Sequence, residues 1–479
     1  MLKCARYLAL AIAILGAMPS AFADVDRVTI TVEPGDRQVF AGFGASQGNW
    51  GRDYQKLTPA ERDRLARFFW RGLRMKSLRL WINLNEYAPD PGRRLTADFR
   101  ARYIDSGLIA DARRNGVVDL LLAPDNAPPA LKVKRPGGPA DFAIPDTNLD
   151  AYAKLIADFI AEIRDETSVL INATGLQNEP NNLDRIAPGQ MPGLVRALRA
   201  ALDARKLQTV RIIAPEGANV DGVYFEAIDR LEADPAAWAA LSGLASHSYA
   251  MAATAEAARR VAGPGGGNLK DYWMTEASDN GPEAPGDAVR AASLASRFLN
   301  DVNQRTTHWI HFIGFEIPDP NDNATRILAY TPGPLRMTVF HKYYYYQQLT
   351  ETFDVGATFR SARGTPGGDM AWTYGKKPRL NAAAARNPDG GWAIGLSNFT
   401  APTFRDDPDD NGGFPARTIE VTIVVPELAG SGDLPCAVHR SGGHLTNASE
   451  AEIVLQGGRA TLSVGPLELV TLRSGAAGR

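Results

Sequence analysis

The pattern of apolar and polar positions changes character near residue 349. From about Val39 to Leu349, short apolar runs alternate with longer stretches whose apolar residues recur at helical spacing. Alternating strands and helices favour parallel βα units, and eight strands are the number that a closed (β/α)8 barrel requires. The eight runs that we interpret as strands are Val39–Gly44, Ser77–Ile82, Asp119–Ala123, Thr174–Gln177, Val210–Ala214, Gly243–Ser246, Asp271–Thr275 and His311–Phe315.

Two of the intervening segments show clear helix signals. Thr58-Pro59-Ala60-Glu61 has the letters of a capping box, with Thr58 as N-cap and Pro59 at the first helical position. After Asn148, apolar residues fall at helical spacing as far as Ile163. We interpret that stripe as core rather than as part of a binding site.

Beyond residue 349 the long helical patterns end. Short, partly alternating runs appear instead, such as Trp392–Ser397, Thr418–Val425, Ala460–Val464 and Leu467–Leu472, and turn-forming residues separate them. That pattern of short alternating runs and turns is typical of a small antiparallel sandwich. The sequence therefore predicts an α/β chain with a TIM barrel over residues 39–349 and a C-terminal all-β sandwich over residues 350–479. Residues 24–38 contain one further strand, Arg27–Val32, which could join the sandwich or the barrel.

The first 23 residues have the pattern of an export signal. Lys3 and Arg6 precede the apolar run Tyr7–Leu15, and Ala21-Phe22-Ala23 is a small-x-small cleavage site. A membrane anchor needs roughly 20 apolar residues, so this run is too short for one. We expect a periplasmic or extracellular protein without a membrane partner.

Composition excludes some partners. Without Lys3 and Arg6 the chain carries 50 basic and 54 acidic residues, a net charge of −4. A chain so close to neutral lacks the broad basic surface that nucleic acid requires. Cys4 lies in the signal, which leaves Cys436 as one thiol with no partner for a disulfide. We expect a monomer.

Two glutamates follow predicted strands at the point where a barrel places its active site. Glu179 comes after the fourth strand and Glu276 after the seventh, 97 positions apart. A pair of carboxyl groups, one protonated and one ionised, can cleave a glycosidic bond. Either glutamate alone is more simply a surface or ion-paired residue. Their shared placement at strand ends favours the catalytic interpretation.

Other polar residues lie on or beyond the same strands. Arg79 interrupts the apolar second strand and must be paired if buried, either with a catalytic carboxylate or with a structural one. His247 and Tyr249 follow the sixth strand, and alternation directs both to one side. Tyr249 could donate to the nucleophile, and His247 could orient it, contact sugar or be a satisfied core histidine.

Further candidates surround this group. Asp125 and Asn126 follow the third strand and could bind sugar hydroxyls, and Asp125 is also a rival carboxylate. Glu316, after the eighth strand, is a second rival. Three tryptophans could stack on a sugar face, although each alone is more often core: Trp50, Trp81 and Trp273.

Metal and nucleotide motifs are weak. His308 and His311 would lie on opposite faces of a strand, so they form no metal site by themselves. Gly44-Ala45-Ser46-Gln47-Gly48 matches the letters of a serine nucleophile elbow but lacks the helix that must follow. We expect no metal and no cofactor.

Five motifs follow one another along the chain: Gly42-Phe43-Gly44-Ala45-Ser46, Pro128-Pro129-Ala130, Gln177-Asn178-Glu179-Pro180, His247-Ser248-Tyr249 and Trp273-Met274-Thr275-Glu276. In this order they resemble glycoside hydrolase family 30, a group of retaining (β/α)8 glycosidases with a side β-sandwich. The resemblance covers nearly the whole chain after residue 23, and the segments Lys342–Tyr346 and Phe359-Arg360 resemble that family's junction between barrel and sandwich.

The resemblance implies roles for five residues. Glu179 would be the acid/base and Glu276 the nucleophile, Asn178 would contact the sugar 2-hydroxyl, and Arg79 and Tyr249 would be neighbours of the nucleophile. Two segments depart from the family. Asn126 and Leu131 stand where the family's loop after the third strand carries tryptophans. Gly314-Phe315-Glu316 stands where the family's eighth strand ends near a tryptophan. These departures affect the substrate more than the mechanism.

The sequence thus predicts a secreted retaining β-glycosidase that acts on a β-linked poly- or oligosaccharide. By family analogy its substrates include β-1,6-linked galactan or glucan, xylan, and simple β-glucosides or β-xylosides. Two alternatives remain open at this stage. One is a non-catalytic carbohydrate-binding protein on a glycosidase scaffold. The other is an inverting or lyase-type enzyme that uses Asp125 or Glu316.

Overall fold

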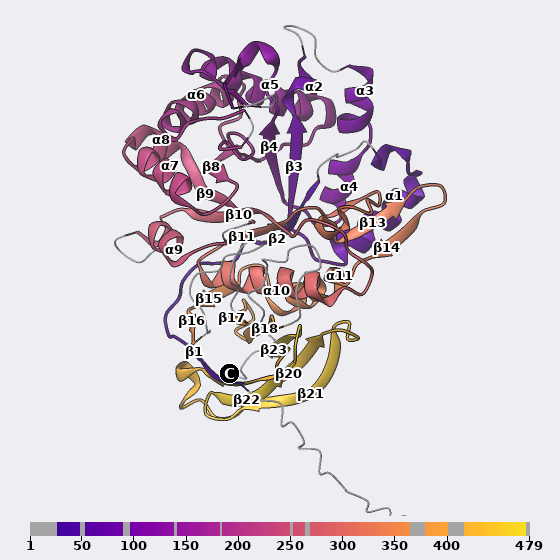
Figure 1. Ribbon diagram of the computed structural model, residues 1–479, viewed down its shortest axis with the longest axis vertical. Helices are drawn as coiled ribbons and strands as arrows, with labels where there is room; N and C mark the ends of the chain where they lie inside the picture. The colour runs from indigo at the N-terminus through magenta and orange to yellow at the C-terminus, as the bar shows by residue number, and fades with distance from the viewer. Residues whose placement is uncertain are drawn as a thin grey trace, which may run out of the picture.

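The structure is a computed structural model (Figure 1). It describes residues 26–47, 53–89, 96–137, 141–182, 184–249, 252–263, 269–364, 379–400 and 416–475. The expected export signal and Trp50 lie outside the described residues. Among the described residues, no helix combines the length and the apolar character needed to cross a bilayer.

Eight parallel strands close into a barrel, as the alternating pattern predicts. Around the barrel the strands follow chain order, and the last strand, β11, closes the circle by pairing with β2. Their bounds are β2 (Gly42–Gln47), β3 (Ser77–Asn83), β4 (Asp119–Asp125), β7 (Ala173–Thr174), β8 (Arg211–Gly217), β9 (Leu241–Ser248), β10 (Asp271–Ala277) and β11 (His308–His311).

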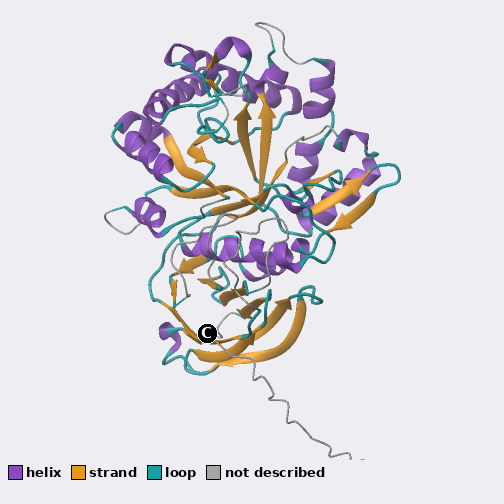
Figure 2. Ribbon diagram, in the orientation of Figure 1, coloured by secondary structure: helices purple, strands orange, loops and turns teal. Residues whose placement is uncertain are grey.

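Helices surround the barrel strands (Figure 2). The Thr58 capping box is confirmed, because the Thr58 hydroxyl accepts from the Glu61 amide and the Thr58 amide donates to the Glu61 carboxylate. The predicted apolar stripe after Asn148 is buried in α5, as expected of core residues. The helices are α1 (Pro59–Ala66), α2 (Leu84–Tyr87), α3 (Ala97–Phe99), α4 (Leu108–Arg114), α5 (Leu149–Thr167), α6 (Met191–Ala204), α7 (Gly222–Glu232), α8 (Pro235–Ala240), α9 (Ala255–Ala262), α10 (Ala288–Asn303) and α11 (Lys342–Thr352).

The eighth barrel strand lies three residues earlier than the sequence predicts. The apolar run His311–Phe315 suggested the strand, but β11 covers His308–His311. His308 can lie inside the barrel because its ring stacks on Trp273 with 3.4 Å between centroids. Phe315 instead begins β12 (Phe315–Glu316), which forms a separate small sheet with β13 (Leu328–Thr331) and β14 (Arg336–Val339).

The last part of the chain forms two packed sheets with a common apolar core. One sheet has the strand order β16-β1-β19-β22, and the other has the order β15-β17-β18-β23-β20-β21. Their bounds are β15 (Thr358–Arg360), β16 (Ala362–Arg363), β17 (Leu380–Arg386), β18 (Trp392–Asn398), β19 (Ile419–Val424), β20 (Leu434–Ser441), β21 (Ala448–Leu455), β22 (Arg459–Val464) and β23 (Leu469–Ser474). A short hairpin, β5 (Val133–Lys134) with β6 (Phe142–Ala143), extends the loop after β4.

The strand β1 (Asp26–Val32) lies in the sandwich. It pairs in parallel with β19, with Val28 opposite Val421, and antiparallel with β16. The β1–β19 pair is therefore a parallel exception within sheets that are otherwise antiparallel.

Helices α10 and α11 lie between the barrel and the sandwich (Figure 1). The Ser296 hydroxyl on α10 lies 2.8 Å from that of Ser397 on β18. The Gln348 amide on α11 donates to the His439 carbonyl on β20 at 2.9 Å. Because these bonds join the two parts from buried positions, the sandwich supports the barrel on the side of β11 and β2.

Candidate active site

A cleft of about 450 Å³ opens at the carboxyl ends of the barrel strands. Its walls come from residues at or just beyond the ends of β3, β4, β7, β8, β9, β10 and β11. The residues that line it are Trp81, Asp125, Asn178, Glu179, Asn182, Ala218, Asn219, Tyr249, Glu276, Asn280 and Phe312. The structure therefore brings both predicted catalytic glutamates into one sugar-sized hollow.

Glu276 lies at the end of β10 and is 4% exposed. Its Oε1 accepts a hydrogen bond from the Arg79 guanidinium, and its Oε2 accepts from the Tyr249 hydroxyl at 2.7 Å. Burial raises the pKa of Tyr249 well above its ordinary value, so the phenol keeps its proton and donates it. Both oxygens of Glu276 thus have the donors that an ionised carboxylate needs.

Glu179 approaches the same point from the loop after β7. Its backbone has a φ of 45°, a left-handed conformation that non-glycine residues rarely adopt. The Glu179 amide donates to the carbonyl of Glu216 at 3.2 Å, which fixes this turn. Strained backbone of this kind is concentrated at functional sites.

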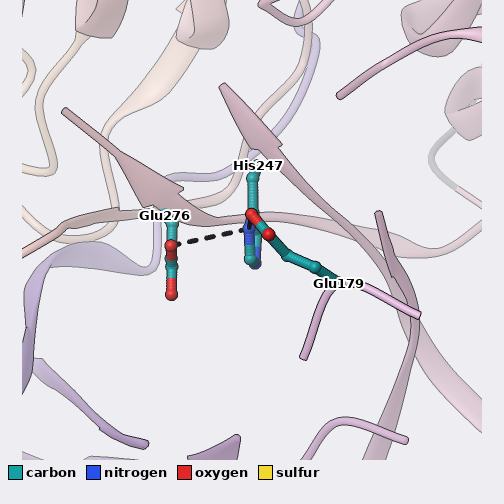
Figure 3. A group of neighbouring side chains, drawn as sticks. All are labelled: Glu179, His247 and Glu276. Carbon is teal, nitrogen blue, oxygen red and sulfur yellow. Dashed lines mark hydrogen bonds and ion pairs between the residues drawn. The ribbon is translucent and has the colours of Figure 1, made fainter. Parts of the chain in front are cut away.

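The two carboxyl groups are close enough to act on one atom. Oxygens of Glu179 and Glu276 and a ring nitrogen of His247 all lie within 4.8 Å of one another. Figure 3 shows the imidazole of His247 next to both carboxyl groups, with Glu276 coming from a strand and Glu179 from a loop. Carboxyl groups about 5 Å apart are typical of glycosidases that retain configuration, whereas inverting enzymes have gaps of about 6.5–9.5 Å.

The contacts of His247 indicate which ring nitrogen carries the hydrogen. Nδ1 lies 2.9 Å from Glu179 Oε1 and 3.5 Å from Glu276 Oε2, both of which are acceptors. Nε2 lies 3.4 Å from Nη2 of Arg79, which can only donate. The hydrogen that faces the glutamates is therefore on Nδ1, and the buried His247 links the two glutamates to Arg79.

Several opposing influences set the ionisation of Glu179. Burial is the largest and acts to raise its pKa, but the hydrogen bonds from His247 and Asn182, the latter at 2.6 Å, together with nearby positive charge such as Arg79, outweigh burial and leave the pKa below its usual value. In this state Glu179 is ionised at neutral pH, which is the form that activates water. To act as an acid it must take up a proton, and that requires acidic solution or a change in these two contacts.

Asn178 is oriented by Arg79. Its Oδ1 accepts from Nη2 of Arg79 at 2.8 Å, so the amide nitrogen remains as a donor on the wall of the cleft. The contact with the sugar 2-hydroxyl that the family resemblance implies for Asn178 stays a prediction.

The two predicted residues after β4 have different surroundings. Asp125 lines the cleft, and burial raises its pKa to about 6, with the nearby charge of Asp184 adding to the effect. Asn126 does not appear among the residues that line the cleft. Its amide donates to Asn83 at 2.9 Å and its oxygen accepts from Lys132 at 2.9 Å. Asn126 therefore shapes the loop, whereas Asp125 remains a candidate for sugar contact.

Trp273 is not available for stacking on a sugar. Its indole is fully buried among apolar side chains inside the barrel, including Leu121 and Ile310, and stacks on His308. The expected role passes to Trp81, which lines the cleft at the end of β3.

The remaining candidates from the sequence, Glu316, the two histidines and Ser46, are not among the residues that line the cleft. Glu316 belongs to β12 and forms an ion pair with Arg326 at 3.0 Å. His311 lies 3.1 Å from the Thr325 carbonyl, while His308 stacks on Trp273. Ser46 is a buried residue inside β2, not the apex of a strand-to-helix turn.

Glu216 is a third carboxyl group at the site, and the sequence analysis overlooked it. It lies near the end of β8, fully buried, with Oε1 3.3 Å from Nη2 of Arg79. Its position just after an apolar strand, in Ala214-Pro215-Glu216, is the signal that could have identified it.

The cluster of Glu179, His247 and Glu276 offers ligand atoms of the kind that bind metal ions. However, the oxygens of Glu276 already accept from Arg79 and Tyr249. A fixed guanidinium at that point repels a cation, so the arrangement suits a carbohydrate hydroxyl better than a metal ion.

Several solved structures share this fold. The catalytic domain of a family 30 xylanase C from Talaromyces cellulolyticus has a TM-score of 0.67 at 16% identity, and the match covers 93% of this chain and 99% of that one. This protein has the glycoside hydrolase family 30 fold. A family 30 endoxylanase from Clostridium papyrosolvens has a TM-score of 0.65 at 17% identity, covering 94% and 100% of the two chains.

An endo-β-1,6-glucanase shares the same fold, with a TM-score of 0.63 at 17% identity over 93% of this chain and 94% of that one. No protein-family model and no curated protein sequence matches the chain. The family 30 fold explains how eight barrel strands and a side sandwich present this cleft. Because the sequence identities are low, the comparisons show the fold, and the chemistry depends on the residues of the site.

Proposed function

We propose that this protein is a retaining β-glycoside hydrolase that cleaves a β-linked poly- or oligosaccharide, and that it acts outside the cytoplasm. One observation carries the proposal. Glu179 and Glu276 bring carboxyl oxygens within 4.8 Å of each other on the wall of a single cleft. That spacing suits two carboxyl groups that act in turn on one anomeric carbon.

In the first step, an oxygen of Glu276 attacks the anomeric carbon and forms a glycosyl ester. The bond from that carbon to the leaving oxygen breaks, and the proton of Glu179 passes to the leaving group. Arg79 and Tyr249 donate to the two oxygens of Glu276 and aim its carboxylate before the attack. Asn178 offers its amide hydrogens to the sugar ring.

In the second step, Glu179 is ionised and takes a proton from a water molecule. The water oxygen attacks the anomeric carbon, the ester bond to Glu276 breaks, and the sugar leaves with its original configuration. The hydrogen bonds from His247 and Asn182 favour the ionised form of Glu179 that this step needs.

The substrate class rests on the cleft and on the comparisons. Trp81 offers a ring for the apolar face of a sugar, and Asp125 offers acceptors for its hydroxyl groups. Xylan and β-1,6-linked glucan are the first substrates to assay, because the solved structures with this fold include two xylanases and an endo-β-1,6-glucanase.

The test is chemical rescue of the nucleophile. Glu276→Ala should lose activity on an activated aryl β-glycoside by about 10⁴-fold or more, and azide should restore turnover. Because azide attacks the face that Glu276 leaves open, the product should be the α-glycosyl azide. The matched control is Glu452→Ala, which removes an exposed glutamate on β21 and should retain full activity.

Two results would count against the proposal. One is a Glu276→Ala variant that remains as active as the control. The other is a wild-type protein that binds β-glycans but releases no reducing ends from any of them, which would support the non-catalytic carbohydrate-binding alternative.

A further inference from the structure

Arg79 is the guanidinium that two buried carboxyl groups share. Nη1 donates to Glu276, whereas Nη2 lies 3.3 Å from Oε1 of Glu216. Both Arg79 and Glu216 are fully buried. If both carboxyl groups were ionised, one positive charge would be set against two negative charges in a pocket from which solvent is excluded, which is costly.

The supply of hydrogen-bond donors is also unequal. Nη2 of Arg79 has two hydrogens, yet it faces three acceptors: Asn178 Oδ1 at 2.8 Å, Glu216 Oε1 at 3.3 Å and His247 Nε2 at 3.4 Å. Asn178 takes the shortest of these bonds. Glu216 is therefore left with a weak, shared donor, whereas Glu276 has Arg79 and Tyr249.

The second oxygen of Glu216 indicates its protonation state. Oε2 is buried and has no hydrogen-bond partner among the described residues. It lies against Gly175, where a Cβ would stand 1.5 Å from it. A bare anionic oxygen in such a place is far more costly than a neutral hydroxyl. Oε1 then serves as the carbonyl that accepts from Arg79.

The charges around Glu216 act in both directions. Arg79 on β3 favours ionisation, as does His247 on β9 when its ring is protonated, whereas Glu276 on β10 opposes it, and the buried phenol of Tyr152 on α5 also lies within range. Burial is the largest influence, and it raises the pKa of Glu216 in spite of the guanidinium.

We propose that Glu216 is a positioning residue: as an uncharged carboxylic acid it holds Arg79 in place, so that the guanidinium charge remains directed at Glu276. This role rests on the proposed function, because it deepens the account of the nucleophile. Glu216 also provides the carbonyl that fixes the backbone turn of Glu179. It therefore supports both catalytic carboxyl groups without contacting the sugar.

The first experiment compares the unfolding of the full-length wild type and Glu216→Gln in urea between about pH 4 and pH 7. A neutral Glu216 keeps a proton in the folded state that an unfolded glutamate releases above its ordinary pKa, so the wild type loses stability as pH rises. Glutamine carries no such proton. The folding equilibrium constant of Glu216→Gln, relative to that of the wild type, should therefore rise by up to about tenfold for each unit of pH.

The second experiment separates shape from charge by kinetics. Glu216→Gln keeps an oxygen that accepts from Arg79, so kcat/KM should stay within about threefold of the wild type. Glu216→Ala leaves Arg79 without that contact, and kcat should fall by about 10- to 100-fold with little change in KM. Glu452→Gln, on the exposed face of β21, controls for the loss of one glutamate.

The outcomes are distinct. The proposal fails if the stability of Glu216→Gln relative to the wild type does not change with pH. It also fails if that relative stability falls as pH rises, which is the result that an ionised Glu216 would give. It also fails if Glu216→Gln is as impaired as Glu216→Ala, or if Glu216→Ala is fully active. The unfolding measurement needs no substrate, so it decides the protonation state of Glu216 even if the proposed function fails.

Discussion

Gly175 leaves the space that the carboxyl group of Glu216 occupies: a Cβ at residue 175 would stand 1.5 Å from Oε2 and 2.5 Å from the carboxyl carbon. Gly175 follows β7 directly, and Glu216 lies near the end of β8, so neighbouring strands fix this contact. Any side chain at residue 175 must displace Glu216 or move the strands apart.

We therefore expect Gly175→Ala to disturb the site through Glu216. The added methyl group should lower the free energy of unfolding by about 1–3 kcal/mol, because the core is overpacked there. Activity should also fall, because a displaced Glu216 carboxyl group would move Arg79. In the double variant Gly175→Ala/Glu216→Ala the methyl group has room, so the two losses of stability should not add. Urea unfolding of all four proteins measures this, and additive losses would contradict the contact.

The Asn182 side chain controls the pH dependence through Glu179. Asn182 donates to Glu179 Oε2 at 2.6 Å, and this bond helps to keep the pKa of Glu179 below its usual value. Asn182→Ala should therefore raise that pKa and move the alkaline limb of kcat/KM to higher pH. The measurement is a pH profile with a substrate whose leaving group needs protonation. With a leaving group that departs unprotonated the shift should vanish, and a shift of equal size there would exclude Glu179 as the acid.

The Asp279–Arg297 pair supports the loop that carries Tyr249. Nη2 of Arg297 lies 2.9 Å from Asp279 Oδ1, and Nη1 donates to the Tyr249 carbonyl at 3.2 Å. Burial acts to raise the pKa of Asp279, but Arg297 and Arg290 outweigh it and lower the pKa to about 2. The pair therefore stabilises the fold above the ordinary pKa of aspartate, and this stability is lost as pH falls from about 4 to 2.

Asp279→Asn should thus be less stable than the wild type by about 3–5 kcal/mol at pH 7, since it leaves Arg297 buried beside a neutral group. The difference in free energy of unfolding should shrink by about 2 kcal/mol as pH falls from about 4 to 2. Unfolding by urea across this range is the measurement. A difference that does not change with pH would mean that Asp279 is not ionised in the folded protein.

Trp81 and Trp273 should respond differently to substitution. Trp81 lines the cleft, so Trp81→Ala should raise KM by about tenfold through loss of stacking on the sugar. Trp273 lies inside the barrel, so Trp273→Phe should lower the free energy of unfolding by about 1–3 kcal/mol and leave KM unchanged. Steady-state kinetics and urea unfolding of both variants test this, and a raised KM in Trp273→Phe would place that ring in the cleft.

The order of the eight barrel strands was predictable because it depends on local patterns, although the first strand covers Gly42–Gln47 rather than Val39–Gly44. Alternating apolar runs gave the eight strands, and Glu179 and Glu276 were identified because carboxyl ends of barrel strands meet at one face. The eighth strand was misplaced because a buried His308 interrupts the apolar pattern, and its stacking on Trp273 is a contact between distant segments.

Simple alternation gives the wrong direction for two carboxyl side chains at the site. The pairing of β10 with β9 shifts register between Met274 and Glu276, and that of β8 with β9 shifts between Pro215 and Gly217. Such bulges change which face the following side chain occupies. Strict alternation from Trp273 would direct Glu276 away from the barrel interior, and alternation from Ile213, which lies inside, would do the same to Glu216. Bulges leave no reliable trace in a single sequence.

The pairing of β1 with β19 has a consequence for how the molecule is made. Asp26–Val32 leaves the ribosome before any barrel strand, yet its parallel partner Ile419–Val424 is synthesised after all of them. The sandwich must therefore stay open until the barrel's entire length has been translated. Until then β1 lacks its partner strand β19, and its apolar residues are not packed. Unpaired strands of this kind are prone to aggregation and are bound by chaperones.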